Sequence, residues 1–210
     1  DNTGTGGVLA LTKTGTGTLT LSGANTYTGQ TTVNAGVLRI TDGAALGDTA
    51  GGTTVASGAR LELKGSITVT GESLTISGSG GNNRGALQTE SGANTWAGNV
   101  MLAANETRVG AVGAGNSLTI AGAIGDGDAN RTLAIRNDGG TTILSGENTY
   151  GGNTDVVIGL LKIDGGDNRL PIGTVLRMGY TEGNDVSTFD LNGWNQQVAG
   201  LLARATTTTT

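Results

Sequence analysis

Polar and apolar residues alternate with a period of two along much of the chain. The clearest segments are residues 18–21, 60–63, 67–70 and 73–76, and glycine follows soon after nearly every such run. This alternation places apolar side chains on one face of a β-strand and polar side chains on the other. No segment has the i, i+3, i+4, i+7 spacing of an amphipathic helix. The pattern therefore predicts an all-β fold built from short strands.

Pairs of aliphatic residues two positions apart mark the expected inward faces of these strands. The pairs are Leu19/Leu21, Leu38/Ile40, Leu61/Leu63, Leu74/Ile76, Leu118/Ile120 and Leu133/Ile135. Glycine contributes 40 of the 210 residues, a composition that also occurs in disordered chains, but regular aliphatic pairs argue against disorder. Aromatic residues make up only 3% of the chain, so we expect a thin aliphatic core that extends along an axis.

An eight-residue phrase occurs three times, as SGANTYTG at residues 22–29, SGANTWAG at 91–98 and SGENTYGG at 145–152. Three of the six aromatic residues of the chain, Tyr27, Trp96 and Tyr150, occupy the same place in this phrase. A recurring unit indicates a stacked repeat architecture, in which each unit buries its apolar face only against its neighbours.

The first copy of the phrase defines a candidate rung of the repeat. We expect a strand at residues 18–22, a turn at 23–29 and strands at 31–34 and 37–40, which together make a rung of about 20–25 residues. About eight or nine such rungs fit in a single domain of residues 1–205, with Thr206 to Thr210 as a tail or linker. The sequence thus predicts a parallel β-helix, and a β-sandwich or barrel of short strands is the alternative.

The spacing of the three copies is irregular, because they begin 69 and then 54 residues apart. Loops of variable length between similar rungs explain this spacing. The segments expected to protrude as loops are residues 78–84, 125–130 and 179–185.

The residues of the phrase have a structural interpretation as well as a binding one. We interpret Asn25, Asn94 and Asn148 as turn asparagines, and we expect Tyr27, Trp96 and Tyr150 to pack over a rung corner, with an exposed platform for sugars as the alternative. The glycines are expected to supply turn conformations: Gly23, Gly29, Gly92, Gly98, Gly146 and Gly152.

Composition restricts the chemistry that the chain could perform. Histidine and cysteine are absent, which removes the commonest general base, the usual zinc ligands and any disulfide. The net charge is −5 without runs of either sign, so the clustered basic residues of a nucleic-acid-binding surface are missing. No apolar stretch of about 20 residues is present, and we expect no membrane insertion by this segment. No cofactor is expected.

One loop resembles a calcium site in part. Asp126, Asp128 and Asn130 have the alternating oxygen ligands of a calcium loop, but Arg131 stands where the loop needs glycine and Asn137 where it needs glutamate. Residues 164–169 are similar. A solvated acidic turn is the competing interpretation of both segments, so these three residues are only weak metal candidates.

Residues 17–40, GTLTLSGANTYTGQTTVNAGVLRI, resemble the passenger-associated transport repeat of bacterial autotransporters. A second copy at 140–163 is similar, and residues 189–201 look like the unit that follows such repeats, whereas the copy at 91–98 departs from the pattern after Gly98. The resemblance implies a right-handed parallel β-helix from a passenger on the outer-membrane surface of a Gram-negative bacterium or released from it. It also implies a parent protein with an outer-membrane barrel.

The expected function is therefore a non-enzymatic stalk that supports secretion, adhesion or self-association, with host or matrix surfaces as candidate ligands. A fibre subunit that stacks end to end is the alternative. Two less favoured hypotheses are a polysaccharide-acting β-helix enzyme, which would need clustered carboxylates, and an ice-binding protein, for which Thr-x-Thr pairs such as Thr68/Thr70 give a motive.

Overall fold

The computed structural model describes residues 8–179 and 186–203. The expected tail, Thr206 to Thr210, and most of the expected loop at 179–185 lie outside these residues, and the domain boundary at 205 stays a prediction. The described chain is almost entirely strand and turn, with one short 3₁₀ helix, η1 (Gly81–Asn83). The prediction of an all-β fold is confirmed. Among the described residues no helix has the length and apolar character of a membrane span.

The strands form two parallel sheets. The first sheet, sheet A, has six strands: β1 (Leu11–Lys13), β3 (Thr31–Val33), β5 (Thr53–Val55), β8 (Leu74–Ile76), β11 (Val100–Leu102) and β14 (Ile124–Gly125). The second, sheet B, has a main path: β2 (Thr18–Leu21), β4 (Val37–Ile40), β6 (Arg60–Lys64), β9 (Leu87–Ser91), β12 (Thr107–Ala111), β15 (Leu133–Leu144), β16 (Thr154–Ile163), β17 (Val175–Met178) and β19 (Gly200–Ala203).

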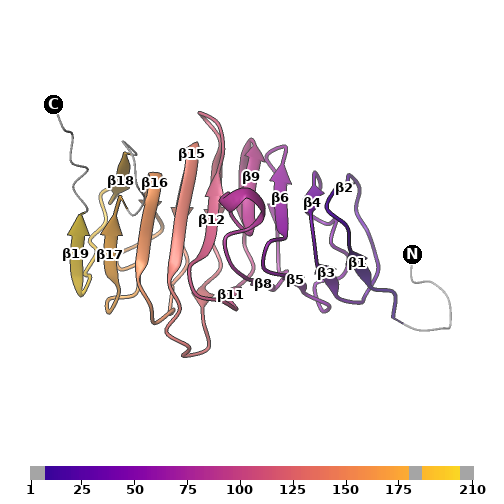
Figure 1. Ribbon diagram of the computed structural model, residues 1–210, viewed down its shortest axis with the longest axis horizontal. Coiled ribbons are helices and arrows are strands. Elements are labelled where there is room, and N and C mark those ends of the chain that lie inside the picture. Colours follow the sequence, from indigo (N-terminus) through magenta and orange to yellow (C-terminus); the bar gives the residue numbers. More distant parts are fainter. Residues whose placement is uncertain (1–7, 180–185, 204–210) are drawn as a thin grey trace.

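Sheet B also has four strands off this path: β7 (Thr68–Val69), β10 (Ala93–Trp96), β13 (Ser117–Ile120) and β18 (Ser187–Asp190). In the ribbon the main-path strands stand side by side across the long axis, with β2 and β19 toward opposite ends (Figure 1). The pairing partner of each strand is one rung further along the chain: Thr18 pairs with Val37, 19 residues later, and Leu61 with Leu87, 26 residues later.

The main path makes about eight turns of a β-solenoid, which confirms the predicted architecture and number of rungs. All strand-to-strand pairings of the described residues are parallel, as a coiling chain requires. The strands expected from the first phrase copy are present as β2, β3 and β4, within one residue of the predicted ends.

The core consists of apolar side chains stacked in register from rung to rung. The longest stack follows the main path of sheet B: Leu19, Leu38, Leu61, Leu87, Val109, Ile135, Val156 and Met178. A second stack in sheet A faces it: Val33, Val55, Ile76 and Leu102, all buried. Of the predicted aliphatic pairs, only Leu19 and Leu21 in the first rung are not fully buried.

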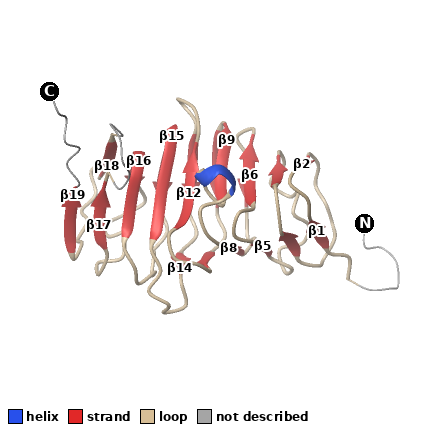
Figure 2. Cartoon of the chain, viewed as in Figure 1, coloured by secondary structure: helices blue, strands red, loops and turns tan. Residues whose placement is uncertain are grey.

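Polar side chains of sheet B lie under the loop that contains the helix η1. The segment 78–84 contains η1, which lies in front of sheet B near β9 and β12 (Figure 2). Arg60, Glu62 and Gln88 point to the outer face of sheet B, yet all three are buried. The guanidinium of Arg60 donates to the carbonyl oxygen of Gly81, so this loop covers the outer face instead of projecting away from it.

Substitutions of two adjacent residues of β11 test which of its side chains belongs to the buried stack. We expect Leu102→Ala to lower the free energy of unfolding by about 2–5 kcal/mol, because Leu102 is 0% exposed and its loss leaves a cavity beside Ile76. Met101→Ala, the matched control, should cost less than about 1 kcal/mol, because Met101 is 41% exposed. Urea denaturation of both variants measures the difference, and equal losses would contradict the assigned faces of β11.

Candidate functional site

The three aromatic residues of the repeated phrase are buried. Tyr27, Trp96 and Tyr150 are each less than 10% exposed, so none of them presents a ring face to solvent. Burial raises the pKa of Tyr27 and of Tyr150, and the hydrogen bond that each hydroxyl makes opposes this effect. These rings pack inside the solenoid. A sugar-binding platform would require exposed rings, so the burial argues against that alternative.

The first and third copies of the phrase make matching contacts. The hydroxyl of Tyr27 lies 2.6 Å from Oγ1 of Thr31, and that of Tyr150 lies 2.6 Å from Oγ1 of Thr154. In the same way Asn25 donates from Nδ2 to the carbonyl oxygen of Ala45 in the next rung at 2.7 Å.

The third copy repeats the asparagine contact and adds to it. Asn148 donates from Nδ2 to the carbonyl oxygen of Arg169 in the next rung at 2.6 Å. Its Oδ1 also accepts from the backbone N–H of Ile124 in the previous rung at 2.8 Å. The asparagine therefore links three consecutive rungs.

The second copy differs from the expected turn. Asn94 and Trp96 lie in strand β10, which pairs with β7 of the previous rung and β13 of the next. The backbone of this segment pairs with both neighbouring strands, so the segment is a β-strand and the expected turn is absent. Asn94 is fully buried, accepts from the N–H of Ile67 and donates to Ser91.

The phrase glycines serve close packing more than turn conformation. Only Gly92 of the six has a positive φ, +87°. A Cβ added at Gly98 would lie 1.8 Å from the carbonyl oxygen of Glu72, and one at Gly146 would lie 2.2 Å from that of Gly122. Gly29 and Gly152 meet similar contacts, whereas a Cβ at Gly23 would meet open space. Side chains are thus excluded where successive rungs touch.

Asp126, the first weak calcium candidate, already has its partners in the backbone. Its carboxylate accepts from the N–H groups of Asp128 at 3.1 Å, Arg131 at 2.7 Å and Gly151 at 3.0 Å. Burial alone would raise the pKa of Asp126, but these donors together lower it below its ordinary value. Asp128 and Asn130 are exposed with positive φ, so this loop is organised as a turn around one carboxylate.

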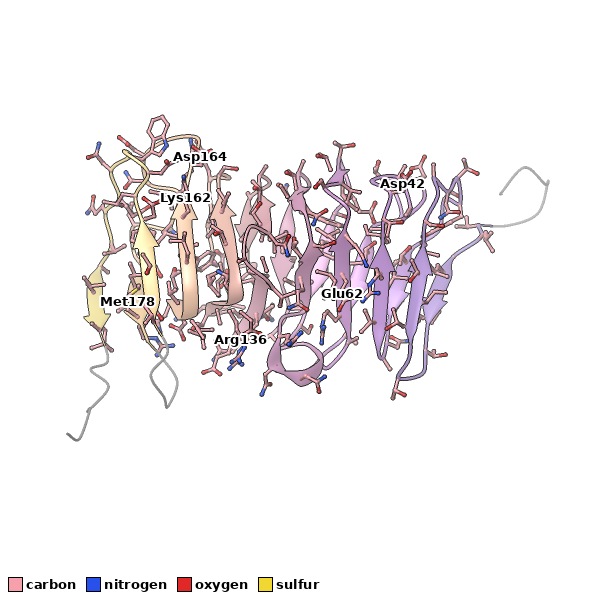
Figure 3. All side chains as sticks on the ribbon, turned by 90° about the horizontal axis from the view of Figure 1, so that it is seen from above. Asp42, Glu62, Arg136, Lys162, Asp164 and Met178 are labelled. Atoms are coloured by element: carbon pink, nitrogen blue, oxygen red, sulfur yellow. The ribbon has the colours of Figure 1, made fainter. Side chains whose placement is uncertain are left out.

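The similar segment 164–169 is also organised by hydrogen bonds. Asp167 accepts from the N–H of Asn195 in the next rung at 2.8 Å. Asp164 accepts from Asn192 and from the indole N–H of Trp194, at 3.2 and 3.4 Å. Figure 3 shows Asp42 and Asp164 along one long side of the ribbon and Arg136 along the other.

Ion pairs between rungs were not identified from the sequence. Arg39 and Glu62 are register partners on β4 and β6, and their charged groups are 2.8 Å apart. Asp155 and Arg177 are register partners on β16 and β17 and make two hydrogen bonds of 2.5 Å. Each of these carboxylates is neutralised by an arginine of a neighbouring rung. The only sequence signal for such a pair is its register, which can be read only once the strand pairing is known.

The described residues contain no group of three or more His, Cys, Asp or Glu that could hold a metal ion. Their most buried acidic residues, apart from Glu72, are paired with arginine or with backbone N–H groups. The structure thus brings together repeat contacts and ion pairs, and the phrase residues that sequence analysis singled out are parts of the rung stack.

Comparison with known families agrees with this arrangement. The profile of the passenger-associated-transport-repeat family matches residues 11–40 and 135–163. Both segments whose sequence resembles the repeat fall within these ranges, and the phrase at 91–98, which forms strand β10, falls outside them.

A curated relative is the Adhesin BmaC autotransporter of Brucella suis biovar 1 (strain 1330). It is 44% identical to this chain over 64 residues, which are 30% of this chain and 2% of the relative. The chain thus aligns with a very small part of that protein. No solved structure matches the chain significantly.

The backbone bonds of Asp126 predict a pH-dependent stability. Because folding lowers the pKa of Asp126, its ionised form stabilises the fold above the ordinary pKa of aspartate, about 3.9, and this contribution is lost as pH falls through the folded value. We expect Asp126→Asn to cost about 1–3 kcal/mol at pH 7, and less at pH 3. Asp190→Asn, which affects one exposed bond to Asn192, is the control. If the unfolding curves of Asp126→Asn coincide with those of wild type at both pH values, the assignment is contradicted.

The two repeat matches cover the segments whose tyrosine and asparagine contacts coincide, and the relative is an autotransporter adhesin. These findings support a location outside the cell or on the outer-membrane surface of a Gram-negative bacterium. Together with the β-solenoid fold, they support an autotransporter passenger segment that carries passenger-associated transport repeats.

Proposed function

We propose that this chain is a non-enzymatic stalk segment of a surface-displayed passenger, where it supports secretion and holds adhesive elements away from the membrane. The observation that carries the proposal is the uninterrupted parallel pairing along the main path of sheet B, from β2 to β19. A stack of this kind extends along a single axis, and each further rung makes it longer. The printed name of the relative, an adhesin autotransporter, supports display for adhesion.

Rigidity follows from how the rungs are joined. Each rung bonds its backbone to two neighbours, and Arg39–Glu62 and Asp155–Arg177 add charged contacts between rungs. Bending the rod would open backbone bonds on one side, and each buried backbone group left unpaired costs about 1–3 kcal/mol. A stalk needs this resistance to bending.

The contacts of the acidic residues support a role without catalysis. A glycan-acting site of the usual kind needs two carboxylates on opposite sides of a substrate bond, about 5–9.5 Å apart. Glu62 and Asp155 are each held by arginine, and Asp126 by backbone N–H groups, so they are committed to the fold. We further propose that the parent protein carries an outer-membrane barrel and that its ligands are host or matrix surfaces, with no nucleic acid.

Deleting one whole rung tests the stalk function. Removing residues 74–99 from the parent passenger brings Val100 into the place of Leu74, its register partner, so β5 can pair with β11. We expect the variant to be displayed at wild-type level, measured by whole-cell antibody binding, and to keep adhesion to host cells. Removing residues 74–86 deletes half a rung and should abolish display, because every later strand loses its register.

The adhesion measured for the whole-rung variant distinguishes a stalk from the alternative in which this segment itself binds the target. Loss of adhesion by the whole-rung variant, with display intact, would overturn the stalk function for these residues. Failure of display in both variants would contradict the modular stacking on which the proposal depends.

End-to-end self-association is a second candidate. The last described strand, β19, leaves Leu201 and Leu202 68% and 47% exposed, and among the described strands it pairs with β17 alone. An unpaired strand edge can pair with a further rung, from the same chain or from another copy. We expect sedimentation velocity to show concentration-dependent oligomers that Leu202→Lys suppresses; a monomer at all concentrations would contradict self-association.

A further inference from the structure

A cavity of about 300 Å³ lies where strand β7 begins the third side of the rungs. Strand β7 pairs with β10 above it, but the segment below it, residues 42–47, is a turn, and no strand pairs with that edge of β7 among the described residues. Thr68, Val69 and Thr70 of the β7 segment line the cavity on one side. The turn lines the other side, so the cavity arises from a change in the number of strands per rung.

The polar lining of this cavity consists of two carboxylates and three hydroxyls: Asp42, Glu72, Thr49, Thr68 and Thr70. No lysine or arginine is among the lining residues. All of these polar side chains carry oxygen atoms, which are the ligands that hard divalent cations prefer.

Glu72 is the most informative of these groups. Its side chain belongs to a residue only 2% exposed, and Oε1 accepts from the hydroxyl of Thr53 at 2.6 Å. The second oxygen, Oε2, is buried and has no hydrogen-bond partner among the described residues. A buried carboxylate oxygen without a partner is costly, and the compensating group must be a proton, water or a cation.

The surroundings of Glu72 make an uncompensated negative charge costly at this position. Burial raises the pKa of Glu72, the hydrogen bond from Thr53 lowers it, and the charge of Asp48 raises it further. Asp42 uses one oxygen, Oδ1, to accept from the N–H of Ala44, and Oδ2 has no hydrogen bond within the described part of the chain. Figure 3 shows Asp42 close to one long side of the ribbon, and its side chain is half-buried.

We propose that this cavity binds a calcium-like divalent cation through the carboxylates of Glu72 and Asp42, with threonine hydroxyls and water completing the shell. Two carboxylates are few for calcium, so the site is weak, in the range of about 10⁻⁴–10⁻³ M that extracellular modules use. The bound ion joins the turn of one rung to β7 and Glu72 of the next and replaces the strand contact missing there.

Thermal unfolding with calcium chloride or with EDTA tests the site. We expect 10 mM calcium to raise the Tm of the full chain by about 3–10 °C. Glu72→Gln, which keeps an acceptor for Thr53, should abolish the shift, and Asp42→Asn, which keeps an acceptor for Ala44, should reduce it. Glu147→Gln removes the same charge from an exposed side chain and should leave the shift unchanged.

A binding measurement at constant temperature accompanies the unfolding test. Terbium(III) is the probe, because Val69 of the cavity wall is the register partner of Trp96, whose indole can sensitise lanthanide emission. We expect emission from wild type that calcium displaces and that Glu72→Gln lacks. Absence of a calcium-dependent Tm shift and of terbium emission in wild type would overturn the proposal, as would an equal response of wild type and Glu72→Gln.

Discussion

Stacking of parallel strands at one spacing is the constraint on which the whole molecule depends. Neighbouring strands in a sheet lie about 4.7–4.9 Å apart, so each position of a rung has a fixed neighbour above and below. Leucine must then stand over leucine, as Leu38, Leu61 and Leu87 do. A charge on the outer face is likewise placed beside the charge of the next rung, as Arg39 is beside Glu62.

The same constraint explains where sequence analysis succeeded. Alternation within a strand is local information, and it correctly predicted the strands around Leu38 and the burial of pairs such as Leu61 and Leu63. The number of rungs followed from the length of one rung. The phrase was harder to interpret, because similar residues lie outside any strand at Asn148 and within a strand at Asn94. The pairing partner decides between these conformations, and that partner is in another rung.

The unpaired carboxylate of Glu72 shows the same limit for the candidate site. Its sequence context, a glutamate between Gly71 and Ser73 next to a strand, is that of an ordinary surface turn. It is buried because the previous rung has a turn at residues 42–47 where later rungs have a third strand. The cavity thus results from the difference between two rungs, which no single segment of sequence contains. The proposed cation site is therefore a property of the stack more than of a motif.

The two matched repeats occupy different sides of the solenoid. Thr31–Val33 of the first repeat form β3 in sheet A, whereas the aligned residues of the second begin β16 and pair with β15 in sheet B. Both bend at a glycine with positive φ, Gly36 and Gly159. The repeat is thus a corner that lies on two different sides of the rungs. The same short sequence therefore directs its neighbouring loops to two sides of the rod, while the register of the stack stays intact.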